Sequence, residues 1–147
     1  EYGRLEDDHA IVMNAESARA LGWEMTTARG ALSPALRERM EWGVAQPATR
    51  VSEAVASLRR LQDGFAAVMD GLDILLTPAA PGQAPVGLAW TGDAVFNFVW
   101  TSLHVPCVTV PAGAGPDGMP LGVQVVGRRG EDRAVLAWAA WVAAALR

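Results

Sequence analysis

The sequence predicts an α/β fold, and three observations support this prediction. The chain has 147 residues, of which 51% are hydrophobic and 19% charged, and this is enough for one domain with an apolar core. Up to about residue 70, apolar residues recur at three-to-four spacing, which is typical of amphipathic helices. After Gly71, the apolar runs shorten to strand length. We therefore expect one domain, 1–147, with a helical segment at 1–70 and a strand, loop and helix segment at 71–147.

The first segment contains three expected helices, over residues 10–22, 34–44 and 51–70. In the first, Ile11, Ala15 and Ala18 fall on one face. The second has Ser33 as its N-cap and Pro34 at the first helical position, the two places where these residue types are favoured. Gly71 ends the third helix.

The second segment is expected to hold strands at 73–77, 106–111 and 121–126 and helices at 94–103 and 131–146. The run "DILLTP" predicts a strand buried on both faces. Residues 78–92 contain three prolines and three glycines, which indicates a long surface loop of the kind that shapes a site or an interface. Glu131 and Asp132 suit the positive amino-terminal end of the last helix.

Composition excludes several classes of protein. The net charge of −4 gives no electrostatic basis for binding nucleic acid. One cysteine, Cys107, cannot form an internal disulfide, and the first residues lack the pattern of a secretory signal, so we expect a cytoplasmic protein. The longest wholly apolar run, 134–146, is shorter than the roughly 20 residues that span a bilayer. The chain starts at Glu1 rather than at methionine, and we expect an amino-terminal part to be missing.

The glycines of "GAGPDGMPLGVQVVGRRG" could belong to a glycine-rich ligand-binding loop or to the turns and strands of a sheet. Their spacing matches neither GxGxxG nor a P-loop, and no helix begins at them. Turn formation at "GPDG" and close backbone packing at Gly122 explain them better. We therefore expect no phosphate-containing cofactor.

Two further clusters could carry chemistry. The run Glu6-Asp7-Asp8-His9 could bind a metal, but a solvated acidic helix entry is favoured, because no other ligands converge at a characteristic spacing. Cys107 lies three residues from His104, but free cysteine is more often a small buried apolar residue than a nucleophile. We expect neither a metal nor a cofactor.

Aromatic residues gather in two places. Beside the Pro/Gly loop, they could form the wall of an apolar pocket or simply pack in the core, and both interpretations remain open for Trp90, Phe96, Phe98 and Trp100. In the last expected helix, Trp138 and Trp141 are favoured as core or interface residues.

Three segments resemble a known family in order and spacing. They are "LDILLTPAAPGQAP", "TGDAVFNFVWTSLHVPCVTVPAG" and "DGMPLGVQVVGRRGEDRAVLAWA", and they resemble the carboxy-terminal portion of amidase signature family hydrolases. The strong resemblance covers about 72–147. Upstream, "LSPALRERMEWG" is similar to the more variable helical stretch that precedes this region in the family.

The resemblance implies an α/β/α sandwich with a mixed central sheet, and hydrolysis of amide bonds by a serine–serine–lysine set. In the family, that set lies on a Gly/Ser-rich segment well upstream of this region. The present chain has five isolated serines and no lysine, because all twelve of its basic residues are arginine. No catalytic residue is therefore assigned here, and we expect the chain alone to be inactive.

The resemblance also implies which residues approach the substrate cleft. The stretch "TGDAVFNFVWTSL" corresponds to a loop and helix at the cleft, and its candidate pocket-wall residues are Asp93, Phe96, Asn97 and Trp100. The chain departs from the family at His104, where glycine is usual two residues before the proline.

Two hypotheses about function follow. The first is a piece of an amidase that acts on small carboxamides when the full chain is present. The alternative is a non-catalytic, amidase-like binding or accessory subunit. The sequence does not separate a general amidase from an allophanate-hydrolase-like enzyme or an aminoacyl-tRNA amidotransferase subunit. Because a piece of a larger sandwich leaves a sheet edge and an apolar face uncovered, we expect the isolated chain to form a homo-oligomer.

Overall fold

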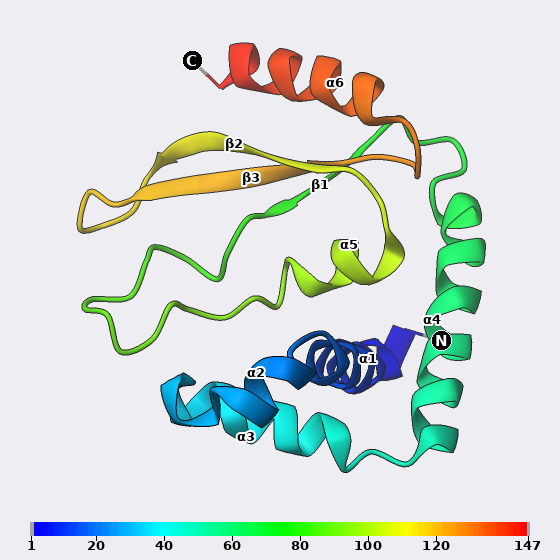
Figure 1. Ribbon diagram of the computed structural model, residues 1–147. Helices are drawn as coiled ribbons and strands as arrows, with labels where there is room; N and C mark the ends of the chain where they lie inside the picture. The colour runs from blue at the N-terminus through cyan, green and yellow to red at the C-terminus, as the bar shows by residue number, and fades with distance from the viewer. Residues whose placement is uncertain (1, 147) are drawn as a thin grey trace. The chain divides into compact units, whose positions relative to one another are not determined.

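The computed structural model describes residues 2–146, and the chain divides into two compact units, Glu1–Leu61 and Gln62–Arg147. The first unit is helical and the second contains all the described strands, so the α/β fold class is confirmed (Figure 1). Within residues 2–146, no helix is long and apolar enough to cross a membrane.

The first unit is built from two short 3₁₀ turns, three α-helices and the beginning of a fourth. These elements are η1 (Tyr2–Arg4), α1 (Leu5–Ala20), α2 (Gly22–Thr27), η2 (Arg29–Ala31), α3 (Pro34–Val44) and the start of α4 (Ala48–Val68). Helix α3 begins as expected, because the Ser33 hydroxyl accepts a hydrogen bond from the Leu36 amide at 3.3 Å.

Three boundaries in this unit differ from the expectation. Helix α1 starts five residues early, because its first turn takes three acidic side chains that favour the amino-terminal end of a helix. It ends at Ala20, and the separate helix α2 was not expected. Helix α4 starts directly after Pro47, whose carbonyl accepts the Val51 amide at 3.1 Å.

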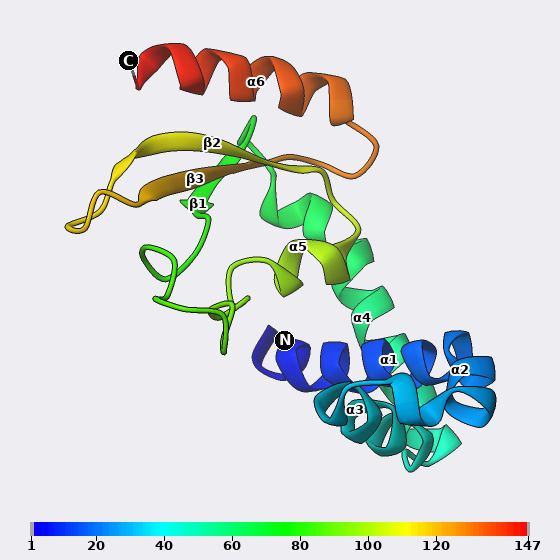
Figure 2. The same cartoon turned by 60° about the vertical axis from the view of Figure 1, so that its left-hand side comes forward.

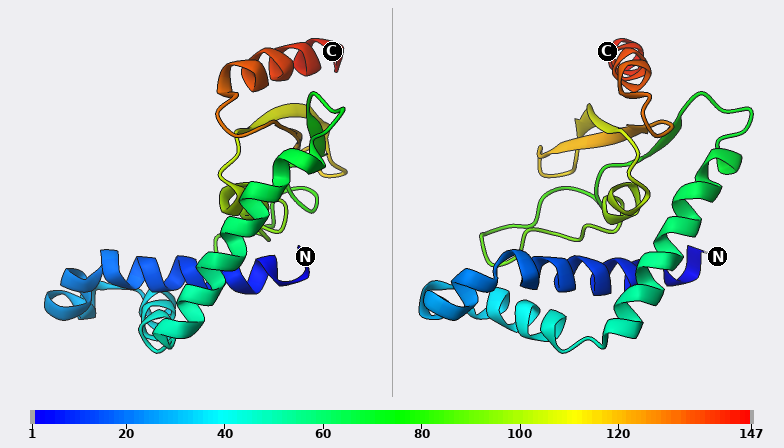
Figure 3. Two further views of the ribbon diagram at one scale, coloured as in Figure 1. Left: turned by 90° about the vertical axis from the view of Figure 1, so that its right-hand side faces the viewer. Right: turned by 45° about the vertical axis from the view of Figure 1, so that its right-hand side comes forward.

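The core of the first unit lies where α1 meets the start of α4. Its buried residues are Ile11, Ala15, Val51 and Ala54. Helix α3 runs beside α1 (Figure 3), and the two backbones come close together at Gly43. A Cβ atom on Gly43 would lie 2.6 Å from the carbonyl carbon of Asn14, so this crossing requires glycine.

The acidic entry of α1 is not wholly solvated, and the expectation is wrong for Asp8. Its side chain is fully buried, and one carboxylate oxygen lies 3.3 Å from the Arg4 guanidinium one turn earlier. Glu6 and Asp7 are exposed, as expected.

The second unit contains the end of α4, a three-stranded sheet and two further helices. The elements are β1 (Leu75–Pro78), α5 (Phe98–Leu103), β2 (Cys107–Ala114), β3 (Pro120–Val126) and α6 (Asp132–Ala145). The strand order is β1-β3-β2, and both pairings are antiparallel. Leu75 pairs with Val126 and Val108 with Val125, which confirms the expected contact among the three strands.

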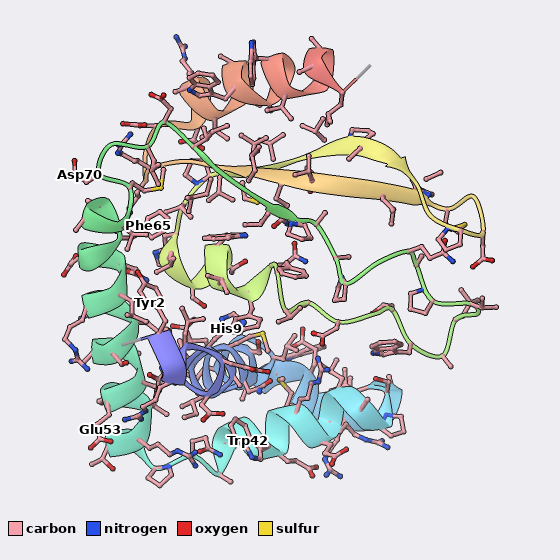
Figure 4. All side chains as sticks on the ribbon, turned by 180° about the vertical axis from the view of Figure 1, so that it is seen from behind. Tyr2, His9, Trp42, Glu53, Phe65 and Asp70 are labelled. Atoms are coloured by element: carbon pink, nitrogen blue, oxygen red, sulfur yellow. The ribbon has the colours of Figure 1, made fainter. Side chains whose placement is uncertain are left out.

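The sheet lies between helical layers (Figures 1 and 2). Helix α6 covers one face and packs on it through Val110, Val125, Val135, Ala139 and Val142. Figure 4 shows side chains filling the space between this helix and the sheet. Helix α5 lies on the opposite face, since its Trp100 hydrogen-bonds Gln124, the strand neighbour of Val125.

Three sequence expectations for this unit need correction. Strand β1 is not buried on both faces, because the side chain of Leu76 is 55% exposed. Among the strands described, the sheet is antiparallel, whereas the resemblance implied a mixed sheet for the complete fold. Helix α5 begins at Phe98 rather than at residue 94, because residues 94–97 form a turn closed by hydrogen bonds to the Ala94 carbonyl.

The departure at His104 coincides with an unusual backbone conformation. His104 follows α5 and has φ of 54°, and it is the one non-glycine residue with positive φ among residues 2–146. A left-handed residue commonly terminates a helix, and glycine takes this conformation without steric cost. The geometry therefore explains why glycine suits this position.

Candidate functional site

A row of polar side chains crosses the sheet on the face that carries α5. Each of the three apolar strands contributes one polar residue, and the register places Thr77 and Thr109 on either side of Gln124. Gln124 is 3% exposed, so its amide must find partners inside the protein.

Gln124 finds those partners on α5, in the turn before it and on β1. Its Oε1 accepts hydrogen bonds from Trp100 Nε1 at 3.0 Å and from Thr77 Oγ1 at 3.3 Å. Its Nε2 donates to Asn97 Oδ1 at 2.6 Å, and Asn97 Nδ2 donates to the Ala79 carbonyl at 3.2 Å. One buried side chain thus joins the polar row of the sheet to α5 and to the start of the Pro/Gly loop.

Helix α5 is fixed from its other side by α4. Gln62 Nε2 donates to the Ser102 carbonyl at 2.7 Å. Phe65, labelled on α4 in Figure 4, packs against Trp100 with ring centroids 6.3 Å apart. Trp100 is therefore held by a ring contact on one side and a hydrogen bond on the other.

A hollow of about 530 Å³ lies beside this network. Its wall is formed mainly by the Pro/Gly loop and by β2 and β3, and most of its lining is apolar. The loop residues Trp90 and Asp93 contribute, and Thr109 and Leu121 contribute from the strands. Gln83 shapes the loop, because its amide hydrogen-bonds the side chain and the backbone amide of Asp117.

A second, more polar hollow of about 330 Å³ lies at α5. Thr109 lines both hollows, so the two share a wall. The remaining lining residues of the polar hollow are Asn97, Trp100, Thr101, His104, Val105, Cys107 and Gln124. Such concave sites with a few convergent polar groups are the usual form of small-molecule sites.

The four residues predicted for the pocket wall take different places. Asp93 lines the larger hollow, and its Oδ1 also accepts the Val95 amide at 3.0 Å. Asn97 and Trp100 line the polar hollow together. Phe96 is half-buried and belongs to the lining of neither hollow. Their role toward a substrate stays a prediction.

Gln124 was missed in the sequence, although a signal was present. It is the one amide side chain in the run "PLGVQVVG", and a polar residue at the centre of a buried strand needs a specific partner.

The two tryptophans of α6 lie in different surroundings. Trp138 packs against the core between α6 and the sheet, whereas Trp141 is 62% exposed.

Cys107 and His104 both line the polar hollow, so the structure brings this pair to one place. Burial raises the pKa of the Cys107 thiol. At neutral pH the thiol therefore stays protonated, and a protonated thiol is a poor nucleophile.

The other candidate cluster was the run Glu6-Asp7-Asp8-His9, considered as a metal site. Burial lowers the pKa of His9 in this run. Among residues 2–146, no group of three or more histidine, cysteine, aspartate or glutamate side chains could hold a metal ion.

The described strands and helices form an α/β fold with two hollows beside its sheet, and comparison with known proteins identifies its family. The Amidase family model matches residues 7–136, and the chain therefore belongs to the amidase family. A solved amidase structure superposes with a TM-score of 0.89 at 28% identity, over 99% of this chain and 36% of that one. The chain is thus similar to a part of an amidase fold rather than to all of it.

Curated relatives are also matched over a part of their length. One subunit of the glutamyl-tRNA(Gln) amidotransferase from Methylocella silvestris is 38% identical over 86 residues, which are 53% of this chain and 17% of that protein. 2-Amino-5-chloromuconic acid deaminase from Comamonas testosteroni is 30% identical over 106 residues, which are 65% of this chain and 23% of that protein. The chain therefore spans less than a quarter of either relative.

Proposed function

We propose that this chain forms one wall of the substrate pocket of an amidase that hydrolyses the C–N bond of small carboxamides. The observation that carries the proposal is the buried Gln124, which ties Asn97 and Trp100 into one network beside two hollows that share Thr109 in their linings. Membership of the amidase family supplies the reaction class. Asp93, Phe96, Asn97 and Trp100 are the proposed wall residues.

The catalytic groups are proposed to lie outside this chain. Amide hydrolysis needs an activated nucleophile and a general base. The chain has no lysine, and its five serines are isolated in the sequence. Two of them have structural uses, because Ser33 caps α3 and the Ser102 hydroxyl donates to the Phe98 carbonyl at 2.7 Å. The chain would therefore shape and orient the substrate while another segment reacts with it.

Complementation tests this proposal directly. We expect no turnover of benzamide or of p-nitroanilides by the purified chain. We expect turnover to appear when an amino-terminal amidase segment that carries the Gly/Ser-rich serine–serine–lysine site is supplied, either fused in front of Glu1 or as a separate fragment. The matched control is the same segment with its nucleophilic serine replaced by alanine, which should stay inactive. Product release is followed by absorbance.

Two outcomes would contradict the proposal. One is clear amidase activity of the chain alone that is abolished by Cys107→Ala or His104→Ala, because this would make the Cys/His pair the reacting site. The other is binding of benzamide without turnover in every complemented form. That second result would favour the alternative, a non-catalytic amidase-like accessory protein, for which the absence of lysine from the sequence is the supporting observation.

We also propose that the isolated chain associates with itself. In the described sheet, β1 and β2 each pair only with β3, so each leaves one edge unpaired. On α6, Leu136 and Trp141 are more than half exposed. Unpaired edges and apolar patches favour association. Light scattering at tens of micromolar should give a dimer or larger species, and a compact monomer would refute this expectation.

A further inference from the structure

The hydrogen-bond network around Gln124 has a fixed direction. An indole N–H only donates and a carbonyl only accepts. The Trp100 indole therefore requires Oε1 of Gln124, which turns Nε2 of the same amide toward Asn97. Asn97 must then present its Oδ1 to Gln124, and its Nδ2 reaches the Ala79 carbonyl. Both amides are consequently oriented from end to end, and neither can flip without losing two hydrogen bonds.

This orientation decides what the polar hollow offers to a ligand. An amide nitrogen carries two hydrogens, and the network uses one of those on Asn97, for the Ala79 carbonyl. Asn97 is exposed and lines the polar hollow, so its second N–H is available as a donor. Apart from His104 and Cys107, the lining contains no titratable side chain. The hollow thus suits a neutral group with an acceptor oxygen.

We propose that Gln124 is a positioning residue that holds the Asn97 amide so that its second N–H donates to the carbonyl oxygen of a neutral carboxamide in the polar hollow. The apolar part of the same molecule would occupy the larger hollow across Thr109, which lines both. This inference rests on the proposed function, because it assumes that this face is a substrate-pocket wall. It adds the orienting residue and the contacting donor.

The test uses benzamide as the probe and nuclear magnetic resonance of the chain as the readout. The Asn97 side-chain amide and the Trp100 indole N–H report the network in the free protein, and their shifts on titration report binding. The test variant is Gln124→Met, which keeps the length of the side chain and removes its three side-chain hydrogen bonds. The control is Gln62→Met, which removes the hydrogen bond from α4 to the Ser102 carbonyl. Ser102 lies on α5, the helix that also carries Trp100, and the substitution leaves the hydrogen bonds of Gln124 intact.

We expect benzamide to shift the Asn97 amide and the Trp100 indole resonances of the wild-type chain. Gln124→Met should weaken this binding at least tenfold and shift both reporters in the free protein. Gln62→Met should lower the melting temperature but leave the affinity for benzamide within about twofold. Trp100→Phe removes the donor that orients Gln124, so its effect and that of Gln124→Met should be strongly non-additive in the double variant.

Three results would overturn the inference, and they are distinguishable. If Gln124→Met binds benzamide as well as the wild type, Gln124 positions nothing for the ligand, while the pocket wall stands. If Gln62→Met weakens binding as much as Gln124→Met, the effect of Gln124 is only structural. If benzamide shifts neither reporter in the wild type, the proposed pocket wall fails together with the inference.

Discussion

Replacing Gly43 with alanine should destabilise the helical first unit by about 2 kcal/mol or more, within the range for overpacked cores. The added Cβ would lie 2.6 Å from the carbonyl carbon of Asn14 and 3.1 Å from the Ala15 nitrogen. Both are backbone atoms of α1, so no side-chain rotation relieves the clash, and α1 and α3 must move apart. Urea denaturation followed by circular dichroism measures the loss of unfolding free energy.

Gly64→Ala is the matched control for this substitution. Gly64 lies inside α4, and a Cβ there would meet nothing within 4 Å. Alanine should therefore stabilise the protein by roughly 0.5–1 kcal/mol, because glycine loses more backbone entropy in a helix. The two substitutions are chemically identical. If they change the unfolding free energy in opposite directions, the difference is due to the steric clash at Gly43 and not to helix propensity. An equal effect of both would show that helix propensity, rather than the close approach at Asn14, governs Gly43.

Much of this fold could be predicted because the local signals are strong. Ser33 and Pro34 marked the start of α3, and the apolar runs located all three strands. What failed was decided by tertiary contacts. The burial of Asp8 could not be read from an acidic run, and the turn at 94–97 replaced the first part of an expected helix through hydrogen bonds to Ala94.

The candidate site was also predicted only in part from the sequence. The resemblance pointed to Asn97 and Trp100, and both line the polar hollow. It did not point to Gln124, because the link between them depends on strand register, which aligns Thr77, Gln124 and Thr109 only after β1 and β2 have paired with β3. The sequence did show a single polar residue in each of three apolar strands. That these residues lie side by side could be inferred only once the strand pairing was known.

Arg128→Ala is expected to have the second large effect, because one guanidinium closes the connection between α4 and β1. Its Nη2 donates to the Met69 carbonyl at 2.7 Å and to the Leu72 carbonyl at 2.8 Å, immediately after the end of α4. Hydrogen bonds to a charged group contribute about 1.5–3 kcal/mol, and these two are made by one nitrogen of a side chain that is 35% exposed, so we expect the lower part of this range for the pair. The partly exposed pair with Glu131, at 3.8 Å, should add little.

The neighbouring arginine provides the control. Arg129 is exposed, and Arg129→Ala should change the unfolding free energy by no more than about 0.5 kcal/mol, as is usual for such surface sites. We expect Arg128→Ala to cost about 2 kcal/mol in urea denaturation, and Arg128→Lys to recover only part of it, since an ammonium lacks the planar fork of a guanidinium. If both alanine variants lose the same unfolding free energy, the loss is due to the removed charge and not to the hydrogen bonds of Arg128. Because β1 begins three residues after Leu72 and carries Thr77, loss of this tie should also disturb the Trp100 indole resonance through Gln124.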